Sequence, residues 1–349
     1  FQKIFVLNLP SRTDRRDSMS LAAALSILQI EYIDGVAGDD VLEKVLPPNN
    51  HKTMAKGNIG SWRAHMNALL TIVEQNISTA LILEDDADWD VRIKRQLETF
   101  ATAALGLQIS LNNSNSTTLS HLRGDIDAST AKGDAESGAS ISISALPRLH
   151  SPKSSPYGLE WDILWLGHCG AQLPFPSPAS RIAIFNDETV PEPQHLKSHP
   201  FAPHDAIASV YPPHTRVVHR SNKTICSIAY AVTQGSARKL LWEFGIRGLD
   251  RGYDFALRDW CDGVIGGVRE EKKGEGGRPM CITVQPPLFS HYFPPKATSD
   301  IMGHGGGYVA KVESKYLRWS VKMNLGRLVW GREVVDQWPD GEGKMGKGV

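Results

Sequence analysis

The hydrophobic pattern alternates between short apolar runs and stretches with helical spacing. Residues 4–9, "IFVLNL", predict a strand, "RRDSMSLAAALSILQI" carries apolar residues at helical spacing, and the strand-like "EYIDGVAG" follows. A second helix is predicted over residues 57–75, before the strand "ALILEDD". Strands that alternate with helices predict an α/β domain with a mostly parallel central sheet, whose ligands gather at the carboxyl ends of the strands.

The composition changes after a predicted helix at 91–107. Residues 108–156 are rich in Ser, Thr, Asn, Gly and Ala, so we expect a disordered low-complexity insertion. Further strands are predicted at "WDILWLG", "TICSIAYAVT" and "MCITVQPPLFSHY", with a Pro-rich irregular segment at 173–214. We expect one domain over residues 1–300, interrupted by the insertion, and a C-terminal extension over residues 301–349 that ends in a flexible tail.

The balanced charge argues against a nucleic-acid-binding protein, and the hydropathy shows no membrane-spanning segment within this sequence. The 349 residues are 41% hydrophobic and carry 38 basic and 38 acidic side chains, so no net charge is available to attract nucleic acid. No apolar run reaches the roughly 20 residues that cross a bilayer. The chain begins at Phe1 and enters a strand-like run almost at once, so we expect that an N-terminal piece, a signal peptide or an anchor, precedes it.

A cluster of acidic side chains directly follows the strand predicted at "ALIL". Glu84, Asp85, Asp86 and Asp88 lie within five residues. If residues 80–88 stay extended, Glu84, Asp86 and Asp88 point to one side and Asp85 to the other. Carboxylates at a strand end suit Mg²⁺ or Mn²⁺, which typically share coordination with substrate phosphates. The cluster therefore predicts a seat for a metal–diphosphate, or else a solvated acidic turn that caps the next helix.

Basic residues surround the first predicted strand-to-helix turn. Asn8, Arg12, Arg15 and Arg16 lie in "NLPSRTDRRDSM", and in a parallel sheet this turn shares an edge with the acidic cluster. Arginines beside a helix N-terminus bind diphosphates through forked hydrogen bonds and the helix dipole. A solvated helix face is the alternative for any single one of them.

The segment "GNIGSWRAHMNAL" places Ser61 and His65 on the first turns of a helix that begins with glycines. It is not a Walker A loop, because the terminal GK[ST] is missing, and this counts against an ordinary nucleotide triphosphatase. A lone histidine is more often structural than catalytic. His65 is a candidate only in combination with the other candidate residues.

Six motifs, in order, resemble glycosyltransferase family 25, which includes bacterial lipooligosaccharide glycosyltransferases and animal procollagen galactosyltransferases. They are "FVLNLPSRTDRRDSM", "GNIGSWRAHMNAL", "LILEDDADWD", "WDILWLG", "SIAYAVTQGSARKLL" and "VQPPLFSH". The resemblance spans residues 3–291 and leaves out the 108–156 insertion and the tail. The chain departs from the family's usual pattern at Ser61 and Ala64, where members often carry Cys and Ser.

The resemblance implies a GT-A (Rossmann-like) fold and an inverting transfer of a hexose, galactose or a similar sugar, from a UDP-sugar to a glycan or protein hydroxyl. It also implies a divalent cofactor, Mn²⁺ (or Mg²⁺). The residues expected to hold the nucleotide sugar are Asn8, Arg12, Arg15, Arg16, Ser61, His65, Glu84 and Asp85, and those expected to hold the metal are Asp86, Asp88 and His291.

An inverting displacement also needs a carboxylate that accepts the proton of the acceptor hydroxyl. By resemblance, Asp254 lies near a family acid that follows the helix of "GSARKLL", so it is the expected base. Pairing with arginines of the same segment on a surface helix is the alternative for Asp254. A structural histidine is the alternative for His291.

Two other functions stay open at this stage. A secreted, catalytically silent carbohydrate-binding or scaffold protein can keep the same fold, and it has no need of Asp86. A metal-dependent phosphohydrolase can use the same acids, but the sequence shows no second His/Asp set that completes a two-metal site. Metal binding that depends on the nucleotide-sugar donor would distinguish a glycosyltransferase from a silent protein.

Cysteines and glycosylation sequons bear on the compartment. Four separated cysteines, Cys169, Cys226, Cys261 and Cys281, have no zinc spacing and are either buried thiols or one or two disulfides. N-x-S/T sequons lie at Asn76, Asn112, Asn115 and Asn222. With the family resemblance, they lead us to expect the secretory pathway, in the lumen of the Golgi or ER, as a type II membrane protein whose anchor lies outside this chain.

Overall fold

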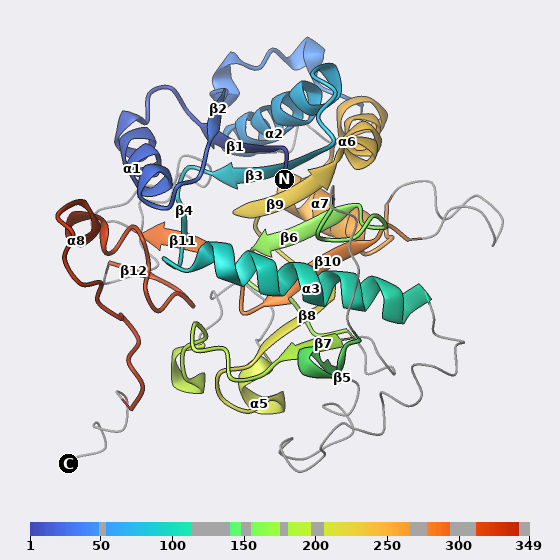
Figure 1. The fold of residues 1–349 in the computed structure, drawn as a ribbon. Coiled ribbons are helices and arrows are strands. Elements are labelled where there is room, and N and C mark those ends of the chain that lie inside the picture. Colours follow the sequence, from blue (N-terminus) through green and yellow to red (C-terminus); the bar gives the residue numbers. More distant parts are fainter. Residues whose placement is uncertain are drawn as a thin grey trace, which may run out of the picture.

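One large sheet forms the centre of the protein. The computed structural model describes residues 1–48, 54–112, 140–147, 155–174, 181–196, 206–265, 278–293 and 312–341. The sheet runs in the order β2-β1-β3-β9-β6-β10-β8-β7-β5, and β4, β11 and β12 join it beside β6 (Figure 1). Its strands are β1 Lys3–Asn8, β2 Glu31–Asp34, β3 Thr79–Glu84, β4 Ala87–Trp89, β5 Ser140–Ser142, β6 Ile163–Gly167, β7 Arg181–Ile184, β8 Arg216–Arg220, β9 Ala229–Thr233, β10 Cys281–Gln285, β11 Phe289–Phe293 and β12 Glu313–Ser314.

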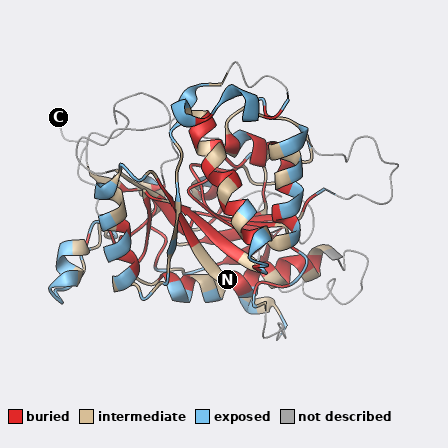
Figure 2. Ribbon diagram, turned by 90° about the horizontal axis from the view of Figure 1, so that it is seen from above, coloured by how far each residue is buried: buried red, intermediate tan, exposed pale blue. Residues whose placement is uncertain are grey.

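Helices lie on both faces of this sheet (Figure 2). They are α1 Thr13–Leu25, α2 Lys56–Glu74, α3 Ile93–Asn112, α5 Ile207–Val210, α6 Gln234–Leu240, α7 Tyr253–Cys261 and α8 Leu325–Val329, and a π-helix at Leu241–Arg247 continues α6. Side chains of β1 alternate between two cores: Val6 packs with α1 and α3, whereas Phe5 and Leu7 pack with α2, α6 and α7. Successive strand residues point to opposite faces, so each apolar strand serves two helical layers.

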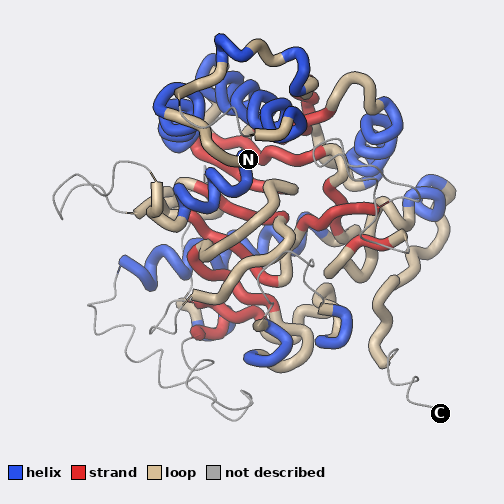
Figure 3. Tube along the Cα trace, turned by 180° about the vertical axis from the view of Figure 1, so that it is seen from behind, coloured by secondary structure: helices blue, strands red, loops and turns tan. Residues whose placement is uncertain are grey.

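The predicted α/β architecture is confirmed. Along the path of the sheet, β8 and β9 run opposite to the rest, and β9 inserts antiparallel between β3 and β6. Figure 3 shows the strands from behind as one continuous layer. Because β1, β3 and β6 share a direction, their carboxyl ends lie at one edge, where the acidic cluster of β3 is found.

Two segment boundaries differ from the prediction. The insertion expected over 108–156 is wrong at its ends, because α3 continues to Asn112 and the strand Ser140–Ser142 pairs in parallel with β7. Helical spacing continues through 108–112, and β5 completes the edge of the sheet. Residues 113–139 and 148–154 of that prediction lie outside the described residues. The strand expected in "MCITVQPPLFSHY", ending in prolines, is confirmed as β10, which ends at Gln285 before Pro286 and Pro287, and a further strand, β11, follows the prolines.

The C-terminal segment packs against the site edge of the sheet. Residues 312–341 lie beside β4 and β11 (Figure 1), where β12 pairs with β11 and Asp90 forms a bridge with Ser320. Residues 301–311 and 342–349 of the expected extension lie outside the described residues. No helix in the described ranges combines the length and the apolar character that crossing a membrane requires.

We predict that Gly60→Ala destabilises the protein. A Cβ at Gly60 would lie 2.4 Å from the Val36 carbonyl oxygen and 2.9 Å from the Gly38 nitrogen, so α2 or the loop after β2 must shift. We expect a loss of about 1–3 kcal/mol in the free energy of unfolding, measured by urea denaturation. The control is Gly326→Ala in α8, where a Cβ meets nothing within 4 Å and a neutral or stabilising effect is expected. Equal unfolding midpoints for the two variants would contradict the prediction.

Candidate functional site

The acidic cluster is divided by a turn. Glu84 is the last residue of β3, Asp85 and Asp86 form the turn, and Asp88 lies within β4. An extended chain through residues 80–88 is therefore the wrong expectation, because the turn separates Asp88 from Glu84 and Asp86. Glu84 and Asp86 are half-buried, whereas Asp88 is fully buried.

The pairing of β4 with β11 brings a histidine to these acids. Ala87 lies opposite His291, and the Tyr292 N–H donates to the Asp86 carbonyl at 2.9 Å. His291 Nε2 lies 3.8 Å from Asp86 Oδ1. Glu84, Asp86 and His291 each offer one ligand atom, and these atoms lie within 4.8 Å of one another. Three of the predicted site residues thus converge in a group that could hold a metal ion.

One oxygen of this group fits a bound cation. Asp86 Oδ1 is buried and has no hydrogen-bond partner among the described residues. A buried carboxylate oxygen needs a donor or a cation, since leaving it unpaired is costly. Carboxylates suit Mg²⁺ and Mn²⁺, and an imidazole extends the set toward transition metals. The ligand set therefore fits a divalent cation.

The first strand-to-helix turn supplies donors to the two turn aspartates. Arg15 Nη1 lies 2.6 Å from Asp85 Oδ1 and 3.3 Å from Asp86 Oδ2. Asn8, which is buried at the end of β1, donates from Nδ2 to Asp85 Oδ2 at 2.8 Å. The expectation that Asn8 and Arg15 lie at the same sheet edge as the acids is confirmed by these contacts. Asp85 is thereby tied to the first turn.

A lysine from the C-terminal segment adds a second positive charge. Lys322 is buried and donates from Nζ to the Asp85 carbonyl at 2.9 Å. Burial works to raise the pKa of Asp86, but the charges of His291, Arg15 and Lys322 outweigh it and hold that pKa below its ordinary value. Burial and the charge of Asp86 raise the pKa of Asp85, and Arg15 opposes them. Asp86 is therefore the carboxylate of the turn that most favours the ionised form.

Asp88 is buried at the carboxyl edge of the sheet and is held by four hydrogen bonds. Its Oδ2 accepts hydrogen bonds from the hydroxyls of Ser314 and Ser320, and its Oδ1 accepts from the N–H groups of Trp89 at 2.8 Å and Lys322 at 3.0 Å. Burial raises the pKa of Asp88, and these donors oppose the rise. The structure therefore does not bring Asp88 to the group of Glu84, Asp86 and His291. Asp88 fastens the C-terminal segment to β4.

His65 supports Glu84 through a hydrogen-bonded serine. It is 1% exposed, stacks on Tyr253 with ring centroids 3.9 Å apart, and lies 3.1 Å from the Tyr230 hydroxyl through Nδ1. Its Nε2 lies 3.4 Å from Ser227 Oγ, which donates to Glu84 Oε1 at 2.7 Å. A contact between His65 and a ligand stays a prediction; the structure shows His65 almost fully buried and linked to Glu84 through Ser227.

Asp254 lies at the first turn of α7 and faces the same site. Its Oδ2 accepts a hydrogen bond from the Cys226 N–H at 3.2 Å. Burial raises the pKa of Asp254, and the charge of Glu84 raises it further. Hydrogen bonds from the Cys226 and Phe255 N–H groups and the charge of His65 act in the opposite direction. The alternative of pairing with arginines describes the neighbouring Asp250 and Asp259, which both contact Arg251. Asp254 is a half-buried carboxylate beside the candidate metal ligands.

The other predicted residues lie farther from the acids. Arg12 forms a two-point contact with Asp14, at 2.9 and 2.8 Å. Arg16 covers the ring of Tyr32 and lies 3.7 Å from Asp34, on the solvated face of α1. Ser61 is half-buried on α2, one turn before His65. For Arg16 the structure shows the surface-helix alternative, whereas Arg12 lies directly before α1 with a half-buried side chain.

Sequence reasoning missed Lys322 and Ser227. Lys322 lies in "RWSVKMN", within the segment treated as an extension, and no spacing connects it to the acids. Ser227 lies in "TICSIAY", where a small polar residue beside an apolar strand was the only available signal. Ser227 reaches the acids through the pairing of β9 with β3, and Lys322 through the bridge between Asp90 and Ser320; the sequence does not display such contacts between distant segments.

We predict opposite roles for two neighbouring aspartates. Asp88→Ala leaves buried donors without an acceptor, so we expect a loss of about 3–5 kcal/mol in the free energy of unfolding. Asp86→Ala removes the attraction of Arg15 and Lys322 together with the repulsion of Asp85, and these changes partly cancel, so we expect a smaller loss of about 1 kcal/mol. Urea denaturation of both variants measures the difference. A larger loss for Asp86→Ala than for Asp88→Ala would contradict this division.

Comparison with known proteins supports the resemblance in one part of the chain. The family model described as "Glycosyltransferase family 25 (LPS biosynthesis protein)" matches residues 1–123. The matched part includes the first three motifs, with Asn8, Arg15, Glu84 and Asp86. Residues such as Asp254, His291 and Lys322 lie beyond it.

Curated relatives match a segment of similar length. Procollagen galactosyltransferase 1-A of Xenopus laevis is 31% identical over 113 residues, and procollagen galactosyltransferase 1-B of the same organism is 33% identical over 113 residues. The inactive glycosyltransferase 25 family member 3 of Homo sapiens is 26% identical over 110 residues. Each match covers 28% of this chain and 18% of the relative, so the chain matches less than a fifth of these relatives' length.

Proposed function

We propose that this chain is a metal-dependent, inverting glycosyltransferase with a GT-A-type fold. It moves a hexose, galactose by analogy with the named relatives, from a UDP-sugar donor to a hydroxyl of a glycan or protein. One observation carries the proposal: Glu84, Asp86 and His291 converge at the carboxyl edge of the sheet, and the buried Asp86 Oδ1 lacks a hydrogen-bond partner among the described residues. The two acids lie in the segment that matches the family.

The donor side follows from the charges at this edge. Glu84, Asp86 and His291 would hold Mn²⁺, which, when bound, stabilises the negative charge of the departing diphosphate. Ser227 holds the Glu84 carboxylate through a hydrogen bond of 2.7 Å. Arg15 and Lys322 keep the turn of Asp85 and Asp86 in place, so the ligands need little reorganisation when the donor binds.

The acceptor side uses Asp254 as general base. The acceptor oxygen attacks the anomeric carbon while the bond from that carbon to the diphosphate breaks, and its proton passes to the Asp254 carboxylate. The diphosphate leaves with the bonding electron pair. Half-burial raises the pKa of Asp254, which makes it a better proton acceptor than a solvated aspartate.

We also propose that the protein works in the lumen of the secretory pathway. The structure contains two disulfides, Cys169–Cys226 and Cys261–Cys281, and such bonds form and persist in oxidising compartments. The sequon residue Asn76 is exposed, whereas Asn222 is half-buried and donates from its side chain to the Leu173 carbonyl at 3.2 Å. Asn76 is therefore the more accessible glycosylation acceptor of these two.

The first prediction from this function concerns donor binding. Calorimetric titration of UDP should show binding with Mn²⁺ and none with EDTA, and Asp86→Ala should weaken it by at least about a hundredfold, because a ligand is lost rather than an outer partner. Arg16→Ala is the matched control, since Arg16 contacts Asp34 on the surface, and it should bind UDP like the wild type. Absence of binding in the wild type would overturn the proposal and favour a silent protein, as the name of one relative describes.

The second prediction concerns the base. Asp254→Asn should lower kcat by about 10²–10⁴-fold and leave Mn²⁺-dependent UDP binding unchanged. Only the carboxylate accepts a proton, so the wild-type rate should fall as the pH drops through the raised pKa of Asp254, above the range of an ordinary aspartate. Asp250→Asn, on the surface beside Arg251, should keep the rate. Full activity of Asp254→Asn would exclude it as the base.

A further inference from the structure

The Cys169–Cys226 disulfide lies between the two sides of the proposed site. Cys169 follows β6 and Cys226 precedes β9, 57 residues later in the chain. Beside the bond, Gly170 and Ile225 form an antiparallel bridge, and the Cys169 N–H donates to the Ile225 carbonyl at 3.0 Å. The sulfurs therefore join two loops at the carboxyl edge of the sheet.

The loop of Cys226 contacts both the metal side and the base side. The Cys226 N–H donates to Asp254 Oδ2 at 3.2 Å. The next residue, Ser227, donates to Glu84 Oε1 at 2.7 Å. Two successive residues of one short loop thus fix a candidate metal ligand and the candidate base.

The backbone of this loop is held in a conformation that side chains rarely adopt. Cys226 has φ of 65°, in the left-handed region that favours glycine. A non-glycine residue stays there only when its surroundings fix it. The fixed points are the disulfide, the Asp254 hydrogen bond and the Trp165 Nε1–H, which donates to the Cys226 carbonyl at 2.9 Å.

The other sulfur reaches the third candidate ligand. Cys169 Sγ lies 3.9 Å from His291 Nδ1, and His291 Nε2 lies 3.8 Å from Asp86 Oδ1. Cys169 is buried, so its position is transmitted to the imidazole by direct packing. The disulfide is therefore linked to Glu84 through Ser227, to Asp254 through the Cys226 N–H and to His291 through Cys169.

We propose that the Cys169–Cys226 disulfide is a positioning element for the metal ligands, so that the site is assembled only in the oxidised protein. The proposal rests on the function proposed above, because it adds a condition on the same site. Without the bond, the two sulfurs move apart to at least van der Waals distance, so Cys169 and Cys226 shift even though the bridge between Gly170 and Ile225 still joins the two loops. Ser227 then no longer holds Glu84, and the packing against His291 is lost.

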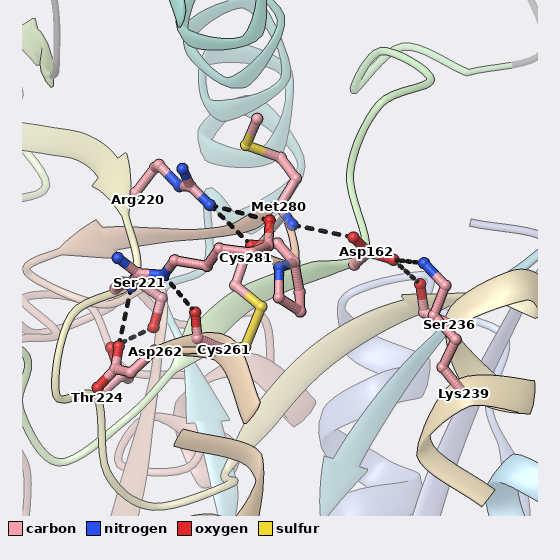
Figure 4. The surroundings of a disulfide bond; sticks show 12 residues. Asp162, Arg220, Ser221, Thr224, Ser236, Lys239, Cys261, Asp262, Met280 and Cys281 are labelled. Atoms are coloured by element: carbon pink, nitrogen blue, oxygen red, sulfur yellow. Dashed lines mark hydrogen bonds and ion pairs between the residues drawn. A yellow bond between two sulfur atoms is a disulfide. The ribbon is translucent and has the colours of Figure 1, made fainter. Parts of the chain in front are cut away.

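The second disulfide provides a matched control. Cys261–Cys281 joins the end of α7 to the start of β10, and its neighbours are Arg220, Asp262 and Met280 rather than the candidate ligands (Figure 4). Because α7 also carries Asp254 at its first turn, the control also tests whether loosening that helix alone disturbs metal binding. Both bonds lie in the same protein and cross-link the same domain.

The experiment compares Cys169→Ser/Cys226→Ser with Cys261→Ser/Cys281→Ser in Mn²⁺ titrations followed by electron paramagnetic resonance, with the thermal midpoint of each variant. Loss of an outer-shell partner costs about 10–100-fold in metal affinity, and we expect a loss of this size only in the first variant. Both variants should melt at lower temperature than the wild type.

A chemical rescue complements the variants. In Cys261→Ser/Cys281→Ser protein, a trialkylphosphine reduces the remaining bond: it gives two electrons, becomes the phosphine oxide with oxygen from water, and two protons end on the thiols. Mn²⁺ affinity should fall, and reoxidation by glutathione disulfide, which leaves as two thiols, should restore it. This measurement does not require the Cys169→Ser/Cys226→Ser variant to fold; if the Cys261→Ser/Cys281→Ser variant fails to fold, the same reduction and reoxidation are applied to the wild type.

The outcomes separate the two proposals. Wild-type protein that binds no Mn²⁺ overturns the proposed function and, with it, a metal-positioning role for the disulfide. Suppose that the wild type binds Mn²⁺. An affinity that does not change when the Cys169–Cys226 bond is reduced, or equal losses of affinity in the two double variants, then overturns the positioning role alone. A selective and reversible loss of affinity supports both.

Discussion

The repulsion among Glu84, Asp85 and Asp86 is the constraint on which this edge of the protein depends. Three carboxylates directly after a buried strand must be balanced by donors or cations, because unpaired charge is costly away from water. The balance comes from distant segments: Arg15 follows β1, and Lys322 lies near the C-terminus. One oxygen of Asp86 stays without a hydrogen-bond partner among the described residues, and it is the oxygen that we propose for a bound cation.

The same constraint makes the C-terminal segment part of the site. Asp88 is buried and gathers hydrogen bonds from Ser314, Ser320 and the backbone of Lys322. This anchor places the Lys322 ammonium over the turn of Asp85. Fold stability and site electrostatics are thus joined over a few residues, since β4 carries the anchor Asp88 and the turn before it carries the candidate ligand Asp86.

Similarity to known proteins and the structure describe different halves of the site. The family match ends at residue 123 and holds the acids of the donor side. Asp254, His291 and the disulfide loops lie beyond it. Asp254 is connected to that side through Cys226 and Ser227, and His291 through its approach to Asp86. The donor side therefore has support from relatives and geometry together, whereas the acceptor side has support from geometry alone.

The sequence by itself determined the α/β architecture and the place of the acids, because apolar periodicity and charge are local properties. It indicated that Asn8 and Arg15 share the edge of Glu84, since carboxyl ends of parallel strands meet. Only the tertiary structure decided that Asp88 is an anchor, that His65 is a buried support, and which cysteines pair. These outcomes depend on a turn, on burial and on the pairing of strands far apart in the chain, and no local pattern encodes such long-range contacts.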